Sequence, residues 1–377
     1  MALTSFTSGA GNGYDFQFLV QRSVGAYTDE VYTSAKKLSG TGIVGANSDI
    51  NTNAEDFIGQ FRWYDSLNSS INVPDVNDAT SGVATELTTS YAKYIKAVRT
   101  HGARDVNIQK VVSQEDGLAK IARDFGETRS QDEHNSILET LDGVSAAEVA
   151  RGAGIVSFTT DADNASTGFF VDINAAGEFG SAAIDTATTR RLFDNTVAGA
   201  ARGERLFKSM GMAWKDYEAP FFYMITSPET LADIRAANLV DDTLVTDGNL
   251  VFQTIYNGKF RLLLTRALGA DQSASANVNA FSTKTTYIVK PSALAMVPLN
   301  IETPVEMDRV AKAYGGSGTT EIWYRWGYVV HPVGYNWSGS EVKFVATSGV
   351  GGFDQAASWT RASQSYLNLG ILPLMHG

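Results

Sequence analysis

The chain has 377 residues, of which 44% are hydrophobic and 19% are charged. This composition excludes wholesale disorder and leaves room for a full core in two or three subdomains. The formal net charge of −11 argues against a dedicated nucleic-acid binder, because such proteins carry a basic face. The absence of cysteine excludes disulfides, thiolate chemistry and zinc sites built on sulfur.

The N-terminal stretch MALTSFTSGAGNGYDF has no basic segment followed by an apolar core, so we expect no signal peptide. No run of the sequence approaches the ~18 apolar residues that a membrane helix needs. We therefore expect a soluble protein, made in the cytoplasm, that has no membrane partner.

Residues 1–55 are rich in glycine, serine, threonine, asparagine and alanine. Within them Val20, Val24, Tyr27 and Val31 recur at three- and four-residue intervals, which predicts a helical insert. A segment of this composition buries little apolar surface by itself. We expect an extended arm that is either mobile or ordered by lying against something else.

Residues 56–112 begin and end with strand-like sequence, and residues 77–82 between them have turn composition. The pattern predicts a long two-stranded excursion. Because an isolated hairpin is marginally stable in water, we expect its stability to come from another chain.

A long helix is predicted next. Ser113 is a candidate N-cap with Asp116 three residues on, and Gly143 is a candidate C-terminal stop. The apolar stripe comprises Leu118, Ile121, Ala122, Phe125, Ile137, Leu138 and Leu141. A single helix of about 29 residues would be about 45 Å long; the alternative is a break around Gly126.

From Thr186 the pattern becomes α/β, after short strands and turns in residues 150–182. It predicts a helix over Thr188–Met210, a buried strand over Phe221–Thr226 and a helix from Ser227 to about Asn238, because proline after a serine cap is a specific start signal. Further strands are expected at Leu250–Tyr256, Lys259–Leu264, Thr285–Val289 and Leu294–Pro298.

The clearest local pattern is TTEIWYRWGYVVHPVGYNW at Thr319–Trp337. Its residues alternate with the period of a strand, and the residues of one face are Ile322, Tyr324, Trp326, Tyr328 and Val330. We predict a strand from about Thr320 to His331 that Pro332 stops and Gly334 turns. At about 3.3 Å per residue such a strand reaches roughly 40 Å, which suits an elongated subunit. We expect a Gly/Ser-rich tail over residues 338–377.

Catalytic and metal-binding groupings are sparse. The four histidines are scattered along the chain: His101, His134, His331 and His376. Asp132, Glu133 and His134 are adjacent, but on the polar face of a long helix we expect them to be a solvated charge cluster rather than a metal site. For His331 we expect a neighbouring backbone group to satisfy the ring.

Other candidates have structural explanations. Glycines at 9, 11 and 13 follow no strand, and Gly315–Gly318 is followed by no Lys-Ser/Thr, so neither predicts a phosphate loop. We expect Asp241 and Asp242 to be turn residues at the surface. The aromatic stripe, with Arg325 as its only basic residue, indicates core packing rather than base stacking. We predict no catalytic residue, no cofactor and no metal.

The order of these parts resembles the tailed-bacteriophage major capsid protein family, whose fold is shared by encapsulin shells. The most specific similarity is EIWYRWGYVVHPVGYNW at Glu321–Trp337, and a second is SPETLADIRAANLVD at Ser227–Asp241. The motif positions are Trp323, Arg325, Trp326, His331, Pro332, Gly334, Tyr335 and Trp337.

The resemblance implies an α+β fold of six parts. These are an N-terminal arm (1–55), an extended hairpin loop (56–112), a peripheral domain with a long spine helix (113–185), an axial α/β domain (186–300), a return to the peripheral domain (301–337) and a C-terminal tail (338–377).

The resemblance also implies a shell subunit without catalysis, forming pentamers and hexamers of an icosahedral phage head around double-stranded DNA, which it holds without sequence recognition. Its place would be the virion, assembled in the host cytoplasm, with itself, a portal, and scaffold or decoration proteins as partners. Lys93, Lys96 and Lys110 permit a lysine–asparagine cross-link. The alternatives are an encapsulin-like compartment and, from another class, a secreted carbohydrate-active or carbohydrate-binding β-rich protein.

Overall fold

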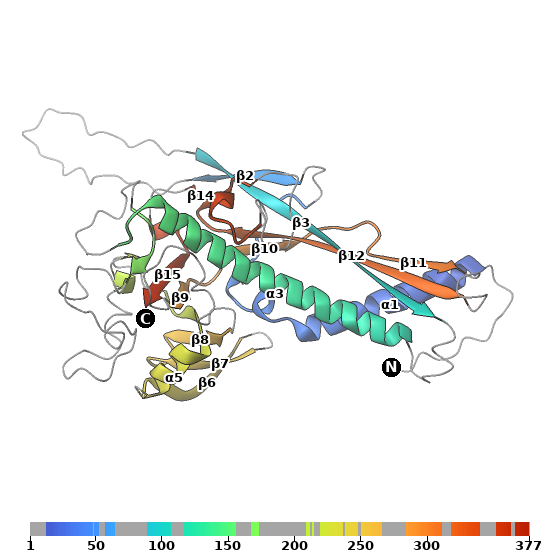
Figure 1. Cartoon of the computed structure of the whole chain (residues 1–377), viewed down its shortest axis with the longest axis horizontal. Coiled ribbons are helices and arrows are strands. Elements are labelled where there is room, and N and C mark those ends of the chain that lie inside the picture. The colour runs from blue at the N-terminus through green and yellow to red at the C-terminus, as the bar shows by residue number, and fades with distance from the viewer. Residues whose placement is uncertain are drawn as a thin grey trace, which may run out of the picture. The chain divides into compact units, whose positions relative to one another are not determined.

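The structure is a computed structural model (Figure 1). It describes residues 13–47, 49–52, 57–64, 89–106, 117–155, 167–172, 209–211, 213–214, 219–236, 238–247, 250–265, 284–310, 318–339, 352–362 and 366–376. The predicted turn at 77–82, the Ser113 cap, nearly all of the predicted helix Thr188–Met210, both glycine-rich stretches apart from Gly13 and Gly318, and Lys110 lie outside these residues.

The chain divides into two compact units. Unit 1 comprises Met1–Lys37, Ala97–Asn135 and Pro298–Tyr328, and unit 2 comprises Leu38–Lys96, Ser136–Val297 and Val329–Gly377. The helices and 3-10 helices are α1 Gly13–Ala35, η1 Leu38–Gly40, α3 Gly117–Arg151, α5 Pro228–Ala236, η5 Ala356–Ser358 and η6 Tyr366–Asn368. No helix among the described segments has the length and apolarity needed to cross a membrane.

One sheet has the strand order β1-β10-β12-β3-β2, and β11 pairs with β12 beside this path. Its strands are β1 Val44–Gly45, β2 Ile58–Tyr64, β3 Thr89–Val106, β10 Leu294–Pro298, β11 Val305–Val310 and β12 Thr319–Pro332. The β2–β3 and β11–β12 pairs are antiparallel, whereas β1 pairs with β10 in parallel.

A second sheet, in unit 2, has the order β4-β15-β9-β5-β8-β7-β6. Its strands are β4 Val171–Asp172, β5 Phe222–Thr226, β6 Val240–Asp247, β7 Leu250–Ile255, β8 Phe260–Leu264, β9 Lys284–Val289 and β15 Ile371–His376. A separate pair joins β13 Tyr335–Trp337 to β14 Trp359–Arg361. These two sheets and the long helix confirm the predicted α+β class.

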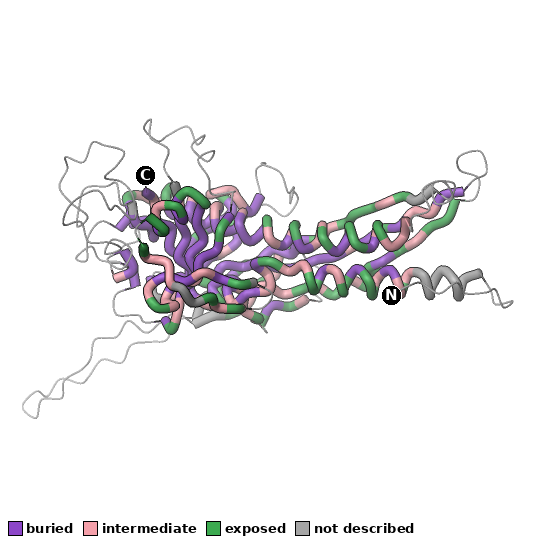
Figure 2. Tube along the Cα trace, turned by 90° about the horizontal axis from the view of Figure 1, so that it is seen from below, coloured by how far each residue is buried: buried purple, intermediate pink, exposed green. Residues whose placement is uncertain are grey.

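The strand predicted at Thr320–His331 is confirmed as β12. Ile322, Tyr324 and Trp326 are buried, while Trp323 between them is 43% exposed, which is the alternation expected of a strand with one covered face. From Trp326 onward every residue of β12 is buried, so the second half of the strand is covered on both faces (Figure 2).

The helix predicted after Ser227 is also confirmed. It begins at Pro228, and the backbone N–H of Thr230 donates to Ser227 Oγ at 3.3 Å, which is the contact that an N-cap makes. The four strands predicted between residues 250 and 298 are present as β7, β8, β9 and β10, each within a residue or so of its expected bounds.

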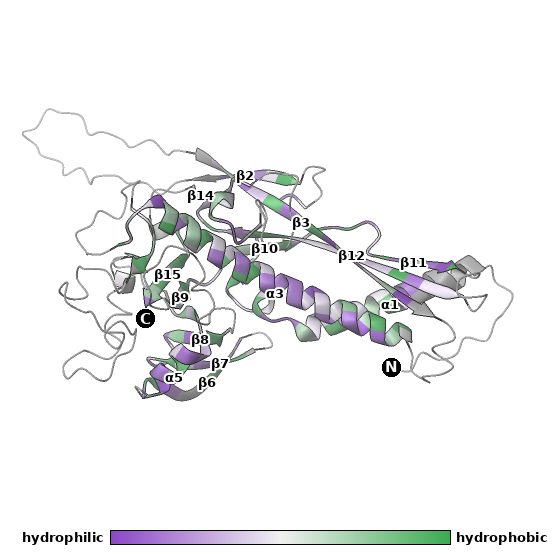
Figure 3. Ribbon diagram, in the orientation of Figure 1, coloured by the Kyte–Doolittle hydropathy of each residue, from purple (hydrophilic) through white to green (hydrophobic). Residues whose placement is uncertain are grey.

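The long helix is continuous, so both the break at Gly126 and the stop at Gly143 are wrong. A Cβ on Gly126 would lie 2.8 Å from the carbonyl oxygen of Thr28 in α1, and one on Gly143 would lie 1.9 Å from the carbonyl oxygen of Phe353. Both glycines therefore admit a neighbouring backbone against the helix rather than end it. Hydrophilic residues along the middle of α3 are visible in Figure 3.

The expectation of an extended N-terminal arm is wrong from Gly13 onward. Those residues form helix α1, which is longer than the predicted insert. Within unit 1, α1 buries Val24, Thr28 and Tyr32, and it packs against β11 as well as α3. This part of the segment is ordered on its own chain and needs no neighbour for its burial.

The predicted excursion is present as the antiparallel pair β2–β3, but β3 also lies beside β12 in a larger sheet. The hairpin is therefore not isolated over its described residues. Two further expectations were incomplete. The predicted tail ends in β15, which lies between β4 and β9, and Asp241 belongs to strand β6 rather than to a turn.

Candidate functional site

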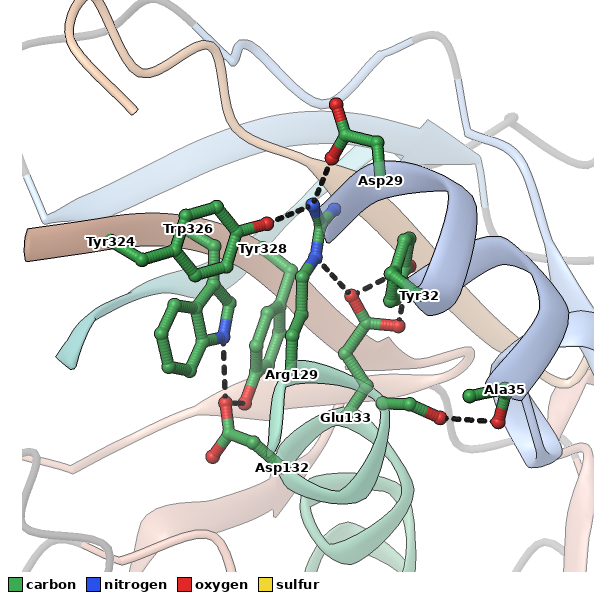
Figure 4. A network of polar contacts seen from close by, with 10 residues as sticks. Asp29, Tyr32, Ala35, Arg129, Asp132, Glu133, Tyr324, Trp326 and Tyr328 are labelled. Carbon is green, nitrogen blue, oxygen red and sulfur yellow. Dashed lines mark hydrogen bonds and ion pairs between the residues drawn. The ribbon is translucent and has the colours of Figure 1, made fainter. Parts of the chain in front are cut away.

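The most connected polar grouping in unit 1 lies on one turn of α3 that faces α1 and β12 (Figure 4). Arg129, Asp132 and Glu133 stand at positions i, i+3 and i+4 of the helix, so their side chains leave neighbouring parts of its surface. We call Arg129, Asp132 and Glu133, with the groups that they contact, the α3 network.

Arg129 joins three elements. Its Nη1 donates to Tyr324 Oη at 2.9 Å and lies 3.6 Å from Asp29 Oδ1, and its guanidinium stacks on the Tyr32 ring at 3.8 Å from the centroid. Burial alone would lower the pKa of Arg129, but Tyr324, Tyr32 and Glu133 hold it above its ordinary value. Arg129 therefore stays cationic and acts as a fixed clamp.

Glu133 is the acceptor for α1. Its side chain is 2% exposed, and both carboxylate oxygens lie 2.7 Å from the Tyr32 hydroxyl that donates to them. Burial and the neighbouring Glu133 charge raise the pKa of Tyr32. Beside this contact, Ser130 Oγ donates to the carbonyl oxygen of Ala35 at 2.5 Å, so the last turn of α1 is tied to α3 at two points.

Asp132 is the acceptor for β12. Its Oδ2 accepts hydrogen bonds from Trp326 Nε1 at 3.0 Å and from the Tyr328 hydroxyl at 2.7 Å, while its Oδ1 lies 3.2 Å from Arg99 Nε on β3. One carboxylate thus satisfies the polar atoms of two core aromatic residues. The prediction that the aromatic stripe is core is confirmed.

The prediction that Asp132, Glu133 and His134 form a solvated charge cluster is wrong. Asp132 and Glu133 contact different elements, as described above. Burial, and then the charge of Lys37, lower the pKa of His134 to about 4. Among the described residues no group of three histidine, aspartate or glutamate side chains could hold a metal ion. Their adjacency in sequence reflects tertiary partners, which a helical pattern does not reveal.

A depression of about 220 Å³ adjoins the α3 network. Its charged lining groups are already paired, because Asp29 contacts Arg129 and Arg325 contacts Glu306 at 2.6 Å. The rest of the lining includes Pro304 and Tyr324. The contacts of the α3 network hold α1, α3 and β12 together.

Unit 2 contains a second fixed grouping, around Glu148 near the end of α3. Arg361 Nε donates to Glu148 Oε1 at 3.1 Å and Arg361 Nη2 contacts Oε2, with both side chains at most 1% exposed. Arg361 Nη2 also donates to the Thr167 carbonyl, and the Phe169 N–H donates to Glu148 Oε2 at 2.8 Å. This ion pair ties the C-terminal segment to α3.

The first three motif positions have different environments. Trp323 is 43% exposed, Arg325 Nη2 donates to Glu306 Oε2 on β11 at 2.6 Å, and Trp326 binds Asp132. Only Trp326 is brought into the α3 network.

The remaining motif positions lie in unit 2. Pro332 is the last residue of β12, and Gly334 has a φ of 87° and packs against Leu369, which explains a glycine there. Tyr335 is buried beside the Glu148–Arg361 pair, and burial together with the Glu148 charge raises the pKa of the Tyr335 hydroxyl. Trp337 packs edge-on against Trp359 at a centroid distance of 5.0 Å.

His331 differs from its prediction. It is 1% exposed, and neither ring nitrogen has a hydrogen-bond partner among the described residues. Its ring makes an edge contact with Phe61 of β2 at a centroid distance of 5.3 Å. Burial alone lowers the pKa of His331 to about 4. The expected backbone partner is absent from the described part of the chain.

Sequence reasoning missed Glu148 and Arg361. The only signal available was a lone charge in each of two otherwise weakly polar stretches, SAAEVA and SWTRAS. Buried charges are normally paired, but more than 200 residues separate these two, so the sequence could not name the partner.

The described residues form an α+β fold with two larger sheets and one long uninterrupted helix, and this fold is similar to that of phage capsid proteins of known structure. The similarity of fold is seen in comparisons with solved structures. The cyanophage Pam1 capsid asymmetric unit aligns with a TM-score of 0.52 at 10% identity, covering 100% of this chain and 96% of that chain.

The capsid of Ralstonia phage GP4 aligns with a TM-score of 0.51 at 12% identity, covering 92% of this chain and 90% of that chain. No family model and no curated protein sequence matches the chain. At these identities the likeness establishes the fold, and the resemblance expected from the sequence is confirmed at that level.

Proposed function

We propose that the chain is the major capsid protein of a tailed bacteriophage, which assembles into the pentamers and hexamers of an icosahedral head around double-stranded DNA. The observation that supports this most directly is the likeness to two phage capsid chains over at least 90% of each partner. Likeness of that extent leaves little of the chain for a different domain.

The α3 network and the Glu148–Arg361 pair suit this role. Buried networks whose members are all satisfied fix one arrangement of a core, and a shell subunit must repeat the same contacts in every copy. We also propose the six-part division, with the first part helical from Gly13 and the last part ending in strand β15, and structural roles for the motif residues, with no catalytic residue and no cofactor.

The charge of the chain bears on its cargo. A net charge of −11 disfavours tight, sequence-independent adhesion to DNA, because such binding depends on lysine and arginine contacts to phosphate. We infer that the inner face of the shell holds DNA without sequence recognition, which suits packaging and ejection. Charge mapping on an assembled shell tests this inference, and a strongly basic inner face would contradict it.

The proposal also places the protein in the virion after assembly in the host cytoplasm, with a portal and scaffold or decoration proteins as partners. The lysines of the hairpin permit a lysine–asparagine cross-link but do not by themselves argue for one. Of the two described candidates Lys93 is exposed and Lys96 is buried, which makes Lys93 the more accessible donor. A ladder of bands from mature particles on a denaturing gel supports the cross-link, and a single band contradicts it.

The test of the function is electron microscopy of the purified chain together with nucleic-acid analysis of particles from infected cells. Shells containing double-stranded DNA support the phage head. Shells that contain protein cargo and no genome would indicate an encapsulin-like compartment instead, and a dispersed protein that binds oligosaccharides would indicate the carbohydrate-binding alternative.

A further inference from the structure

Trp323 is 43% exposed on one face of the β11–β12 pair in unit 1. On β11 and β12, Glu306 stands opposite Trp323 and Asp308 stands opposite Glu321, so these four side chains share a face. The other face of β12 carries Tyr324 and Trp326, which contact α3. We call Glu306, Asp308, Glu321 and Trp323 the tryptophan face.

The side chain of Trp323 is held by contacts with its neighbours. Its ring lies against Gly102, where an added Cβ would be 2.7 Å from Cζ3. Two cross-strand ion pairs flank the tryptophan face: Arg104 Nη2 lies 2.5 Å from Glu321 Oε1, and Arg325 Nη2 lies 2.6 Å from Glu306 Oε2. Tryptophan and arginine are among the residue types that interface hot spots favour.

The charge of this face is unbalanced. Its three carboxylates meet two guanidinium groups, because Asp308 is exposed and has no ion-pair partner among the described residues. An apolar centre with a net negative rim excludes nucleic acid as the occupant and favours a partner that presents an aromatic residue among cations.

Unit 2 presents such a surface at the edge strand β2. Arg62 stands opposite Tyr91 and Gln60 stands opposite Lys93, and all four side chains are exposed. The Tyr91 ring is 54% exposed, with the Arg62 guanidinium 5.5 Å from its centroid. We call Gln60, Arg62, Tyr91 and Lys93 the tyrosine face; it carries two cations and no carboxylate.

We propose that the tryptophan face of one copy docks on the tyrosine face of a second copy. The two surfaces have opposite net charge and each is centred on one exposed aromatic residue, so they are complementary in chemistry. A contact between two different patches of the same chain is heterologous, and heterologous contacts are the kind that build rings. The inference rests on the proposed function, because only an assembling chain presents both faces to neighbours.

The chain has no cysteine, which permits a trap without background. One preparation carries Asp308→Cys and the other carries Lys93→Cys, and the mixture assembles in the presence of a short bis-maleimide. The expected product is a cross-linked dimer that forms in the mixture and not in either preparation alone. The matched control is Asp124→Cys, an exposed aspartate on α3, mixed with Lys93→Cys.

Charge exchange gives a second readout. Asp308→Lys alone and Lys93→Asp alone should each lower the yield of shells, and both changes in one chain should restore it, because each interface then regains an opposite pair. Trp323→Ala should weaken association of copies about tenfold or more, with the thermal unfolding of the unassembled chain measured to separate binding from folding.

The possible results distinguish failure of the docking inference from failure of the proposed function. Cross-linking at the level of the Asp124→Cys control while shells still form would overturn the docking inference and leave the proposed function intact. Failure of the double exchange to restore shells would also overturn the docking inference. Unmodified copies that never associate would overturn both.

Discussion

Gly126 of α3 lies directly against Thr28 of α1: a Cβ added to Gly126 would be 2.8 Å from the Thr28 carbonyl oxygen and 2.9 Å from the Tyr32 backbone nitrogen. Backbone atoms move less readily than the end of a flexible side chain. The two helices therefore approach as closely as they do because position 126 has no side chain.

The first prediction concerns this position. In an open helix Gly→Ala stabilises by roughly 0.5–1 kcal/mol, but here the added methyl group forces two backbones apart. We expect Gly126→Ala to lower the free energy of unfolding by about 1–3 kcal/mol. Denaturant unfolding measures the change, and Asp124→Ala on the exposed side of α3 is the control. A stabilised Gly126→Ala variant would show that α1 does not pack there.

The second prediction concerns Asp132, which accepts from Trp326 and Tyr328 and pairs with Arg99. Asp132→Asn retains the shape and removes the charge, so the ion pair between Asp132 and the partly buried Arg99 is lost. We expect a loss of about 1–3 kcal/mol in unfolding free energy, read by chemical denaturation. Asp124→Asn should be within about 0.5 kcal/mol of the parent chain; equal effects at the two positions would contradict the network.

The third prediction concerns the buried pair of Glu148 and Arg361. Removing one partner leaves the other charge buried, which costs about 3–5 kcal/mol. We expect Arg361→Met to release the segment that contains β14 and β15, and hydrogen exchange should rise first in residues 352–376. Replacing both charges, as in Glu148→Gln with Arg361→Met, should cost less than the single change. A double variant that is worse than Arg361→Met would rule out this explanation.

The fourth prediction is a pH dependence. The pKa of His331 falls from 6.5 to about 4 on burial, so the unfolded chain binds a proton more readily than the folded chain. The contribution of His331 to the free energy of unfolding is therefore fully present above about pH 6.5 and is lost progressively as the pH falls towards 4. The shift corresponds to at most about 3 kcal/mol.

Measurements between pH 5 and 7 avoid the range in which most carboxylates titrate. Within this window His331→Leu should flatten the pH dependence of unfolding. Burial also lowers the pKa of His134, so His134 accounts for the pH dependence that remains in His331→Leu. An unaltered slope in His331→Leu would show that His331 is charged in the folded protein or is not buried.

Local signals predicted the elements whose structure is set locally. The start of α5 follows from a serine cap and a proline at the first helical position. Strand β12 follows from large apolar and aromatic residues at every second position. Both signals come from residues that lie close together in the sequence, so they can be recognised without knowledge of tertiary contacts.

The predictions that were wrong concern residues whose environment is set by contacts remote in sequence. Gly126 and Gly143 look like helix breakers, yet each admits a distant backbone. Asp132 and Glu133 look solvated because their partners on β12 and α1 are remote in sequence. Strand β15 was hidden because Pro373 interrupts its pattern, although Pro373 stands opposite Tyr287 within an antiparallel pair.

Self-association of the chain is the property that decides the proposed function. Sedimentation velocity of the purified chain at rising concentration, with electron microscopy of the same samples, measures it directly. We expect large closed particles of uniform size, with fivefold and sixfold clusters of copies. A single slowly sedimenting species at every concentration, with no particles in the images, would contradict the claim that this chain builds a shell.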